Sequence, residues 1–450
     1  MTPSSPSLTK HPPASFWEVI SLSLPFILVL FSGSLMGLCD RLILSHYSLE
    51  AVEGSISALY LAQLFQIPCI RIASTAQILI GQFRGAGEYK WMGPVVWQMI
   101  WFSFFSFVIT FPLSIPIGKV FFQGTSIQGE GIAYFSSMMA INFLFPLGAA
   151  LSSFYFGQGQ PRKVVIASLW SHTLHILLDF LFIFGFKGII PPLGVKGAAL
   201  SAGIAQLLFC IILFKDFLNS AHRQSHRTEK WTFNRSFFWK CLQIGVPRAG
   251  SKMALLIAWA CVTHIMVHKG GDYLAVLAFG GTINLFYTCF NEGMSQAITT
   301  IGAYLVGAKQ FLLWKLARSA SLFLGLGALL LAIPCLFFPE SMIFVFFKEA
   351  PSITLGHQLC LSCYGLWLLF ITHGLNSIFF GLLNSYGDTL FQMVFSSTIG
   401  VIVQLLPVYL VIGIGNAPPS SLWLLLAFAC LISALAYCLR LNQGKWRVTN

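Results

Sequence analysis

Long apolar stretches alternate with short polar segments along the whole chain. About 20 mainly apolar residues are enough to cross a lipid bilayer as a helix, and the pattern predicts twelve such helices. They are expected at 17–43, 52–80, 93–117, 133–156, 164–186, 194–215, 245–268, 274–299, 316–338, 357–383, 391–413 and 420–440. A polar stretch, "NSAHRQSHRTEKWTFNR" at 219–235, separates the sixth helix from the seventh. An even number of crossings predicts both termini on one side of the membrane.

Composition narrows the class further. Of the 450 residues, 56% are hydrophobic and only 9% are charged, whereas a soluble domain carries about 25% charged residues. We therefore expect an all-α integral membrane protein whose surroundings are the lipid bilayer. The net charge of +12 would suit a nucleic-acid partner. However, the basic residues lie between the apolar stretches, as membrane topology requires, so no nucleic acid is expected.

The basic residues also predict the orientation. With a cytoplasmic N-terminus, eighteen of the 26 Lys and Arg residues fall in inner segments and six in outer segments. Basic residues favour the cytoplasmic side, so we expect a multi-pass protein of the cell membrane (plasma or inner) with both termini cytoplasmic. The first apolar stretch continues to about Leu44, which is too long for a signal-peptide core of about 7–15 residues. It is expected to be a retained first helix.

The two halves of the chain share markers at nearly one offset. Pro25 is followed by Pro247 after 222 residues, and Gly85-Ala86 by Gly307-Ala308 after 222. "SSFYFG" at 152–157 resembles "NSIFFG" at 376–381 after 224. Such a repeat predicts two pseudo-symmetric six-helix lobes, an architecture typical of transporters. The expected division is a cytoplasmic N-terminal tail at 1–16, an N-lobe at 17–215, a cytoplasmic linker at 216–244, a C-lobe at 245–440 and a cytoplasmic C-terminal tail at 441–450.

Six motifs in order along the chain carry a resemblance to a known family. They are "LPFILVLFSGSLMGLCDRLILSH" (24–46), "ILIGQFRGAG" (78–87), "GVKGAALSAGIAQ" (194–206), "IGVPRAGSKMALL" (244–256), "TTIGAYLVGAK" (299–309) and "NSIFFGLLNSYGDT" (376–389). Together they resemble the multidrug and toxic compound extrusion (MATE) exporters. The resemblance implies two six-helix lobes in a V around a central cavity, and export of organic cations in exchange for H⁺ or Na⁺. One departure is "SHYS" at 45–48, where the family usually has "GHxG".

Acidic side chains inside predicted helices indicate a coupling-ion site. An ionisable group at a helix centre costs about 2.5–3.5 kcal/mol on insertion scales. Asp40 and Asp179 both lie in the outer half of the predicted N-lobe. Two neighbouring carboxylates in a medium of low dielectric cannot both stay ionised cheaply, so at least one is expected to take up a proton. The resemblance adds that one branch of the family uses aspartates at the matching positions for its coupling ion.

His175 lies one helical turn before Asp179, where the family commonly has Asn. An imidazole can donate, accept or relay a proton, so His175 favours H⁺ coupling, with Na⁺ left open. His172 shares the same helix face and is expected to be a packed histidine or a second relay group. A zinc site from His172, His175 and Asp179 is the less favoured alternative, because no further strong ligand is evident.

The predicted C-lobe lacks the matching acids. Branches of the family that place coupling carboxylates on the seventh and tenth helices would have them near Leu255 and His373. We therefore expect the ion site in the N-lobe alone, and His373 is interpreted as a polar cavity residue, a weak titrating group or a packed histidine. Cys360 and Cys363 have C-x-x-C spacing inside a predicted helix, and apolar packing is favoured over redox or metal chemistry.

Opposite charges at equivalent depths of the repeat suggest a gate. The offset of 222 carries Arg71 onto position 293, next to Glu292. An Arg71–Glu292 salt bridge between the lobes would form in one state of the transporter and break in the other. Lys252 is the alternative partner for Glu292.

The chain contains no G-x-x-x-x-G-K-[ST] segment, so no ATP hydrolysis and no cofactor are expected. The predicted function is a secondary antiporter, not an enzyme. It is expected to act as a monomer that exports cationic or amphipathic small molecules, with Phe, Trp and Met lining its cavity.

Two alternatives to drug export stay open. The first is a lipid-linked precursor flippase of the same superfamily, for which Arg71, Lys252 and Arg248 would hold a pyrophosphate. The second is a membrane-embedded acyltransferase with an intramembrane histidine, which the twofold repeat disfavours.

Overall fold

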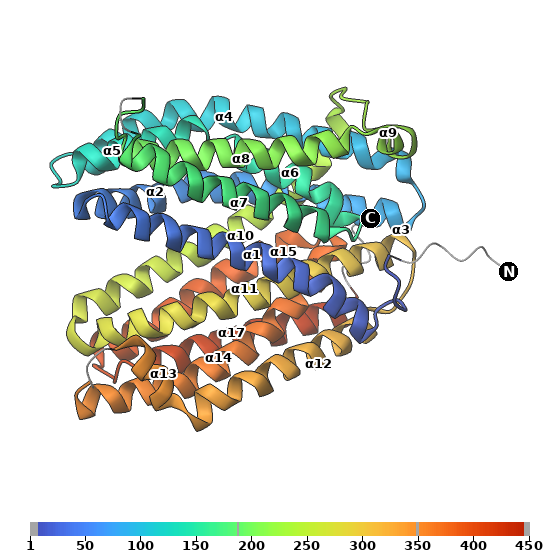
Figure 1. Cartoon of the computed structure of the whole chain (residues 1–450). Helices are drawn as coiled ribbons and strands as arrows, with labels where there is room; N and C mark the ends of the chain where they lie inside the picture. The colour runs from blue at the N-terminus through green and yellow to red at the C-terminus, as the bar shows by residue number, and fades with distance from the viewer. Residues whose placement is uncertain (1–7, 187–188, 348–350, 445–450) are drawn as a thin grey trace. The chain divides into compact units, whose positions relative to one another are not determined.

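The computed structural model describes residues 8–186, 189–347 and 351–444, and these are almost entirely helical (Figure 1). A chain in lipid satisfies its backbone hydrogen bonds internally, and helices do so within one segment. The α-helices are α1 (Phe16–Ser45), α2 (Leu49–Ala73), α3 (Ala76–Gly85), α4 (Met92–Phe122), α5 (Gln128–Ala140), α6 (Leu144–Gly157), α7 (Pro161–Phe184), α8 (Val195–Phe217), α9 (Ser220–His226), α10 (Arg235–Lys269), α11 (Gly271–Gly307), α12 (Leu313–Ala332), α13 (Pro339–Phe346), α14 (Ile353–Tyr386), α15 (Thr389–Ile399), α16 (Leu406–Val408) and α17 (Ser421–Asn442).

Eleven helical stretches of the described chain are long and apolar enough to cross a membrane. A further pair, α5 and α6, is bent by 42° and gives a twelfth crossing if it counts as one span. The predicted all-α membrane fold is therefore confirmed. The terminal residues of the predicted tails, 1–7 and 445–450, lie outside the described residues. Four of the basic residues counted for the orientation also lie there: Lys187, Lys348, Lys445 and Arg447.

Several predicted helices are interrupted. The one expected at 52–80 is divided into α2 and α3 at Ser74 and Thr75, whose hydroxyls both donate to the Arg71 carbonyl. The one expected at 391–413 contains two π-helical segments, Gly400–Leu405 and Tyr409–Ile414. Pro407 lies between them, and proline lacks the N–H that a regular helix requires. Hydropathy does not detect such breaks, because the residues around them remain apolar.

The molecule divides into two compact units. Unit 1 comprises Met1–Ile27, Gly250–Val306 and Gln310–Asn450, and unit 2 comprises Leu28–Ala249 and Gly307–Lys309. The chain passes from one unit to the other inside α1 and inside α10, in each case two residues after a proline, Pro25 or Pro247. The lobe boundaries deduced from the sequence stay a prediction.

Unit 2 is a bundle in which α7 lies along α8 and α2 lies along α5, while α6 contacts α2, α3, α4 and α8 (Figure 1). Phe154, Tyr155 and Phe217 are fully buried in one of its apolar clusters. The Tyr155 hydroxyl donates to the Leu213 carbonyl at 2.7 Å, which fixes α6 against α8.

Unit 1 is built around α14, which lies along α17 and contacts α12. Trp423 and Phe370 are among its buried side chains. The residues just before α1 are attached to the same unit, because Ser319 of α12 donates to the Ala14 carbonyl at 2.8 Å. The part of the predicted N-terminal tail next to α1 is therefore anchored.

Candidate functional site

Three ionisable side chains inside the spans meet in unit 2. Asp40 comes from α1, and His175 and Asp179 lie one turn apart on α7. The Nε2 atom of His175 is 3.8 Å from Oδ1 of Asp40 and 3.7 Å from Oδ1 of Asp179. The structure thus brings together the three residues that were predicted to bind the coupling ion.

Four polar atoms of this cluster lack hydrogen-bonding partners. Asp179 is 0% exposed, and neither of its carboxylate oxygens has a partner. The same holds for Oδ1 of Asp40 and Nε2 of His175. Buried polar atoms without partners are costly, so the cluster is suited to receive a proton or a cation. One ligand atom from each of the three residues lies within 4.8 Å of the others.

Further polar side chains surround the cluster. His172 is half-buried one turn before His175 and interacts with it electrostatically. Tyr134 of α5 is buried near both carboxylates, and sequence reasoning missed it. No local pattern marks Tyr134, because its proximity depends on the packing of α5.

A second polar cluster lies in unit 1. The ammonium group of Lys252 on α10 donates to Oε1 of Glu292 on α11 at 2.6 Å. His373 of α14 is close enough to interact electrostatically with both residues. Its Nδ1 accepts from the side-chain amide of Asn291 at 3.2 Å. Lys252, the alternative partner in the sequence prediction, is therefore bonded to Glu292.

Arg71 lies in the last turn of α2, in unit 2. Arg248 is buried in the same unit, donates weakly to Oγ1 of Thr75 at 3.4 Å, and is near enough to Arg71 for the two guanidinium groups to repel each other. The predicted Arg71–Glu292 bridge would join the two units and stays a prediction.

Comparison with known proteins identifies the family. The MatE family model matches residues 25–181 and 249–410, which is most of the chain. The chain belongs to the MatE family, the multidrug and toxic compound extrusion transporters. All eight candidate residues, from Asp40 to His373, lie inside the matched segments.

Several individual proteins resemble this MATE chain. It is 26% identical to the probable multidrug resistance protein NorM of Thermotoga maritima, over 84% of this chain and 81% of that protein. It is 23% identical to the uncharacterized transporter YisQ of Bacillus subtilis, over 67% of each chain. A multidrug resistance MATE family transporter solved in an outward-facing conformation has the same fold, with a TM-score of 0.83, 16% identity and coverage of 99% and 100%.

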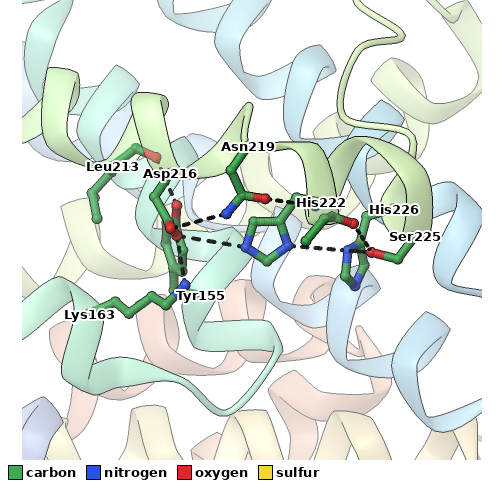
Figure 2. A network of polar contacts seen from close by, with 9 residues as sticks. Tyr155, Lys163, Leu213, Asp216, Asn219, His222, Ser225 and His226 are labelled. Carbon is green, nitrogen blue, oxygen red and sulfur yellow. Dashed lines mark hydrogen bonds and ion pairs between the residues drawn. The ribbon is translucent and has the colours of Figure 1, made fainter.

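One polar network of this MATE chain lies largely outside the matched segments. Asp216, at the end of α8, accepts from Lys163 at 2.7 Å and lies 3.7 Å from Nε2 of His222 on α9 (Figure 2). The Nδ1 atoms of His222 and His226 are 3.4 Å apart. The network was not predicted, because 219–235 was interpreted only as a polar linker.

The same linker is bonded to α4. The indole of Trp97 donates to the Thr228 carbonyl at 2.7 Å, and Gln98 accepts from the backbone N–H of Asn234 at 2.9 Å. Gly93 permits this approach, because a Cβ there would lie 2.6 Å from the His226 carbonyl oxygen. The linker is thus a docked segment of unit 2.

Proposed function

We propose that this MATE transporter exports organic cations or amphipathic drugs in exchange for H⁺, and that Asp40, His175 and Asp179 bind the proton. The observation that carries the proposal is the buried cluster in which four polar atoms lack hydrogen-bonding partners. The multidrug resistance names of the relatives support a drug as the substrate.

The cluster suits proton coupling because it joins two helices. A proton that enters from the outer side gives one carboxyl group a donor, which then bonds to a neighbouring acceptor. His175 lies between Asp40 and Asp179 and is placed to pass the proton from one to the other. The new bond changes the attachment of α1 to α7, and this change lowers the affinity of the transporter for the exported cation. Release of the proton to the cytoplasm resets the cycle.

The test is ethidium uptake by inside-out vesicles that contain the full chain, with H⁺ and Na⁺ gradients imposed separately. An acidic lumen is expected to drive uptake in the wild type, and Asp179→Asn is expected to abolish it, because the amide cannot carry the proton. Glu53→Gln removes an exposed carboxylate of α2 in the same unit and is the matched control.

Each outcome bears on the proposal. Uptake driven by a Na⁺ gradient alone would make Na⁺ the coupling ion. Normal H⁺-driven uptake by Asp179→Asn would show that the cluster does not bind the coupling proton. Absence of uptake under both gradients, with folded protein in the vesicles, would reject cation export.

A lipid-linked precursor flippase is the second candidate. The two neighbouring guanidinium groups of Arg71 and Arg248 favour it, since paired arginines bind phosphate groups. Translocation of a fluorescent polyprenyl pyrophosphate in proteoliposomes, lost in Arg248→Gln, would support this function. Ethidium transport without lipid translocation would reject it.

A further inference from the structure

Glu292 occupies a position that no other acid in the described part of unit 1 shares. It lies well inside the 37-residue helix α11. Asp272 and Glu340 are exposed in the first turns of α11 and α13. Asp388 forms a salt bridge with Arg440 at 2.8 Å. Glu18 is buried and accepts a hydrogen bond from the backbone N–H of Ala14 at 2.7 Å. In the described part of unit 1, Glu292 is thus the acid in mid-span.

The Lys252–Glu292 pair remains partly accessible. The Lys252 side chain is 29% exposed and that of Glu292 is 26% exposed. A ligand can therefore reach the carboxylate without unfolding the bundle. Charged residues within a span are usually functional, and a partly open pair is better placed for exchange than one enclosed on all sides.

The bond between Lys252 and Glu292 is of the kind that a protonated amine ligand would make with Glu292. Lysine presents a compact ammonium group on a flexible four-carbon chain, and its contact with Glu292 is a short, charge-assisted hydrogen bond at 2.6 Å. A protonated amine can make the same bond in the same place. An arginine would hold the carboxylate through two parallel bonds and would be harder to displace.

We propose that Glu292 binds the protonated amine of the transported molecule, and that Lys252 is a tethered competitor that occupies the carboxylate when no substrate is bound. This inference rests on the proposed function as a cation exporter and adds the residue that recognises the charge. The preceding residue, Asn291, is fully buried, and its side-chain carbonyl oxygen has no hydrogen-bonding partner. Because the substrate amine replaces Lys252, the Glu292 carboxylate has a positively charged partner both with and without bound substrate.

The test is equilibrium binding of doxorubicin, a fluorescent primary amine, to the purified full chain in detergent at pH 7.5. Glu292→Gln is expected to weaken binding by about tenfold or more, because a charge-assisted bond becomes a neutral one. Lys252→Gln is expected to tighten binding by about fivefold, because the competing ammonium group is gone. N-acetylated doxorubicin, which lacks the charge, should bind equally to both variants.

Controls separate recognition from a structural role. Glu340→Gln removes an exposed acid of the same unit and should bind doxorubicin like the wild type. If the pair only stabilises the fold, Lys252→Gln will bind more weakly and unfold at a lower temperature. The double variant Lys252→Gln/Glu292→Gln, in which no charge is left without its partner, should fold but bind doxorubicin weakly.

Failure of this inference can be distinguished from failure of the proposed export function. Unchanged doxorubicin binding by Glu292→Gln, or no tightening by Lys252→Gln, would overturn this inference while leaving H⁺-driven ethidium uptake as it is. A wild type that binds neither doxorubicin nor ethidium would reject cation export itself.

Discussion

At the scale of single residues, the cluster of Asp40, His175 and Asp179 shows which contacts helix periodicity predicts and which it does not. His175 and Asp179 are four residues apart, so their proximity on α7 follows from helix geometry, and their 3.7 Å contact agrees with it. Asp40 is on another helix, and its 3.8 Å distance to His175 depends on the packing of α1 against α7. Lys252 and Glu292 are likewise 40 residues apart, and only the fold places them in contact.

Gly307 gives a prediction at the same scale. A Cβ at this position would overlap the backbone carbonyl oxygen of Gln82 in α3, so Gly307→Ala must displace backbone. We expect it to lower the free energy of unfolding by about 3 kcal/mol. The measurement is the thermal unfolding midpoint of the purified protein in detergent.

Gly281→Ala is the matched control for Gly307→Ala. Both glycines belong to α11, but a Cβ at Gly281 would meet nothing within 4 Å. Alanine favours the helix by about 1 kcal/mol relative to glycine, so Gly281→Ala should unfold at the same or a higher temperature. Equal midpoints for the two variants would contradict the predicted clash.

At the scale of elements, α9 and its flanking linker form a docked segment with a histidine pair, of which His222 is buried and His226 is half-buried. His222 and His226 contact the ring of Phe154 edge-on, and the charged groups near them are Asp216, Lys163 and Arg84. Burial lowers the pKa of His222, while burial, His222 and Arg84 together lower the pKa of His226 to about 4. The docked linker therefore favours neutral imidazoles.

The docking is expected to weaken in acid. An undocked histidine takes up a proton near pH 6.5, whereas docked His226 does so only near pH 4. The stabilisation is thus complete above about pH 6.5 and declines as the pH falls toward 4. Hydrogen exchange of residues 219–234, corrected for the intrinsic rate, should be several-fold faster at pH 5.5 than at 7.5.

Replacing both histidines by asparagine should remove this pH dependence, although it can change the level of protection. Protection that is equal at the two pH values in the wild type would contradict the prediction. So would a full pH dependence in the His222→Asn/His226→Asn variant.

At the scale of the whole molecule, the distribution of charge predicts the orientation in the membrane. Lysine and arginine concentrate in the segments interpreted as cytoplasmic, by eighteen to six. The docked linker belongs to those segments and carries several of these charges. The positive-inside rule therefore predicts a cytoplasmic position for both termini and for the linker.

Cysteine labelling tests this orientation. Lys230→Cys introduces a thiol at an exposed linker position, and Glu340→Cys introduces one at an exposed position of a predicted outer segment. A membrane-impermeant maleimide should label the first only in inside-out vesicles and the second only in right-side-out vesicles, above the labelling of the wild type. The reverse pattern would invert the topology.

The sequence by itself determined the all-α membrane class and the family of this protein. It did so because hydropathy, helical periodicity and short motifs are properties of consecutive residues. It also identified four charged side chains well inside the predicted helices, Arg71, Asp179, Lys252 and Glu292, since charges are conspicuous among apolar residues. The breaks at Ser74–Thr75 and in the π-helical segments around Pro407 were not predicted, because they leave the apolar pattern intact.

Only the tertiary structure decided which of those side chains meet. The approach of Asp40 to His175, the bond of Lys252 to Glu292 and the docking of His222 beside Asp216 all join different helices. Periodicity indicates the face on which a residue lies but not the helix that packs against that face. That choice depends on complementary surfaces such as Gly93, whose missing side chain lets the linker approach α4.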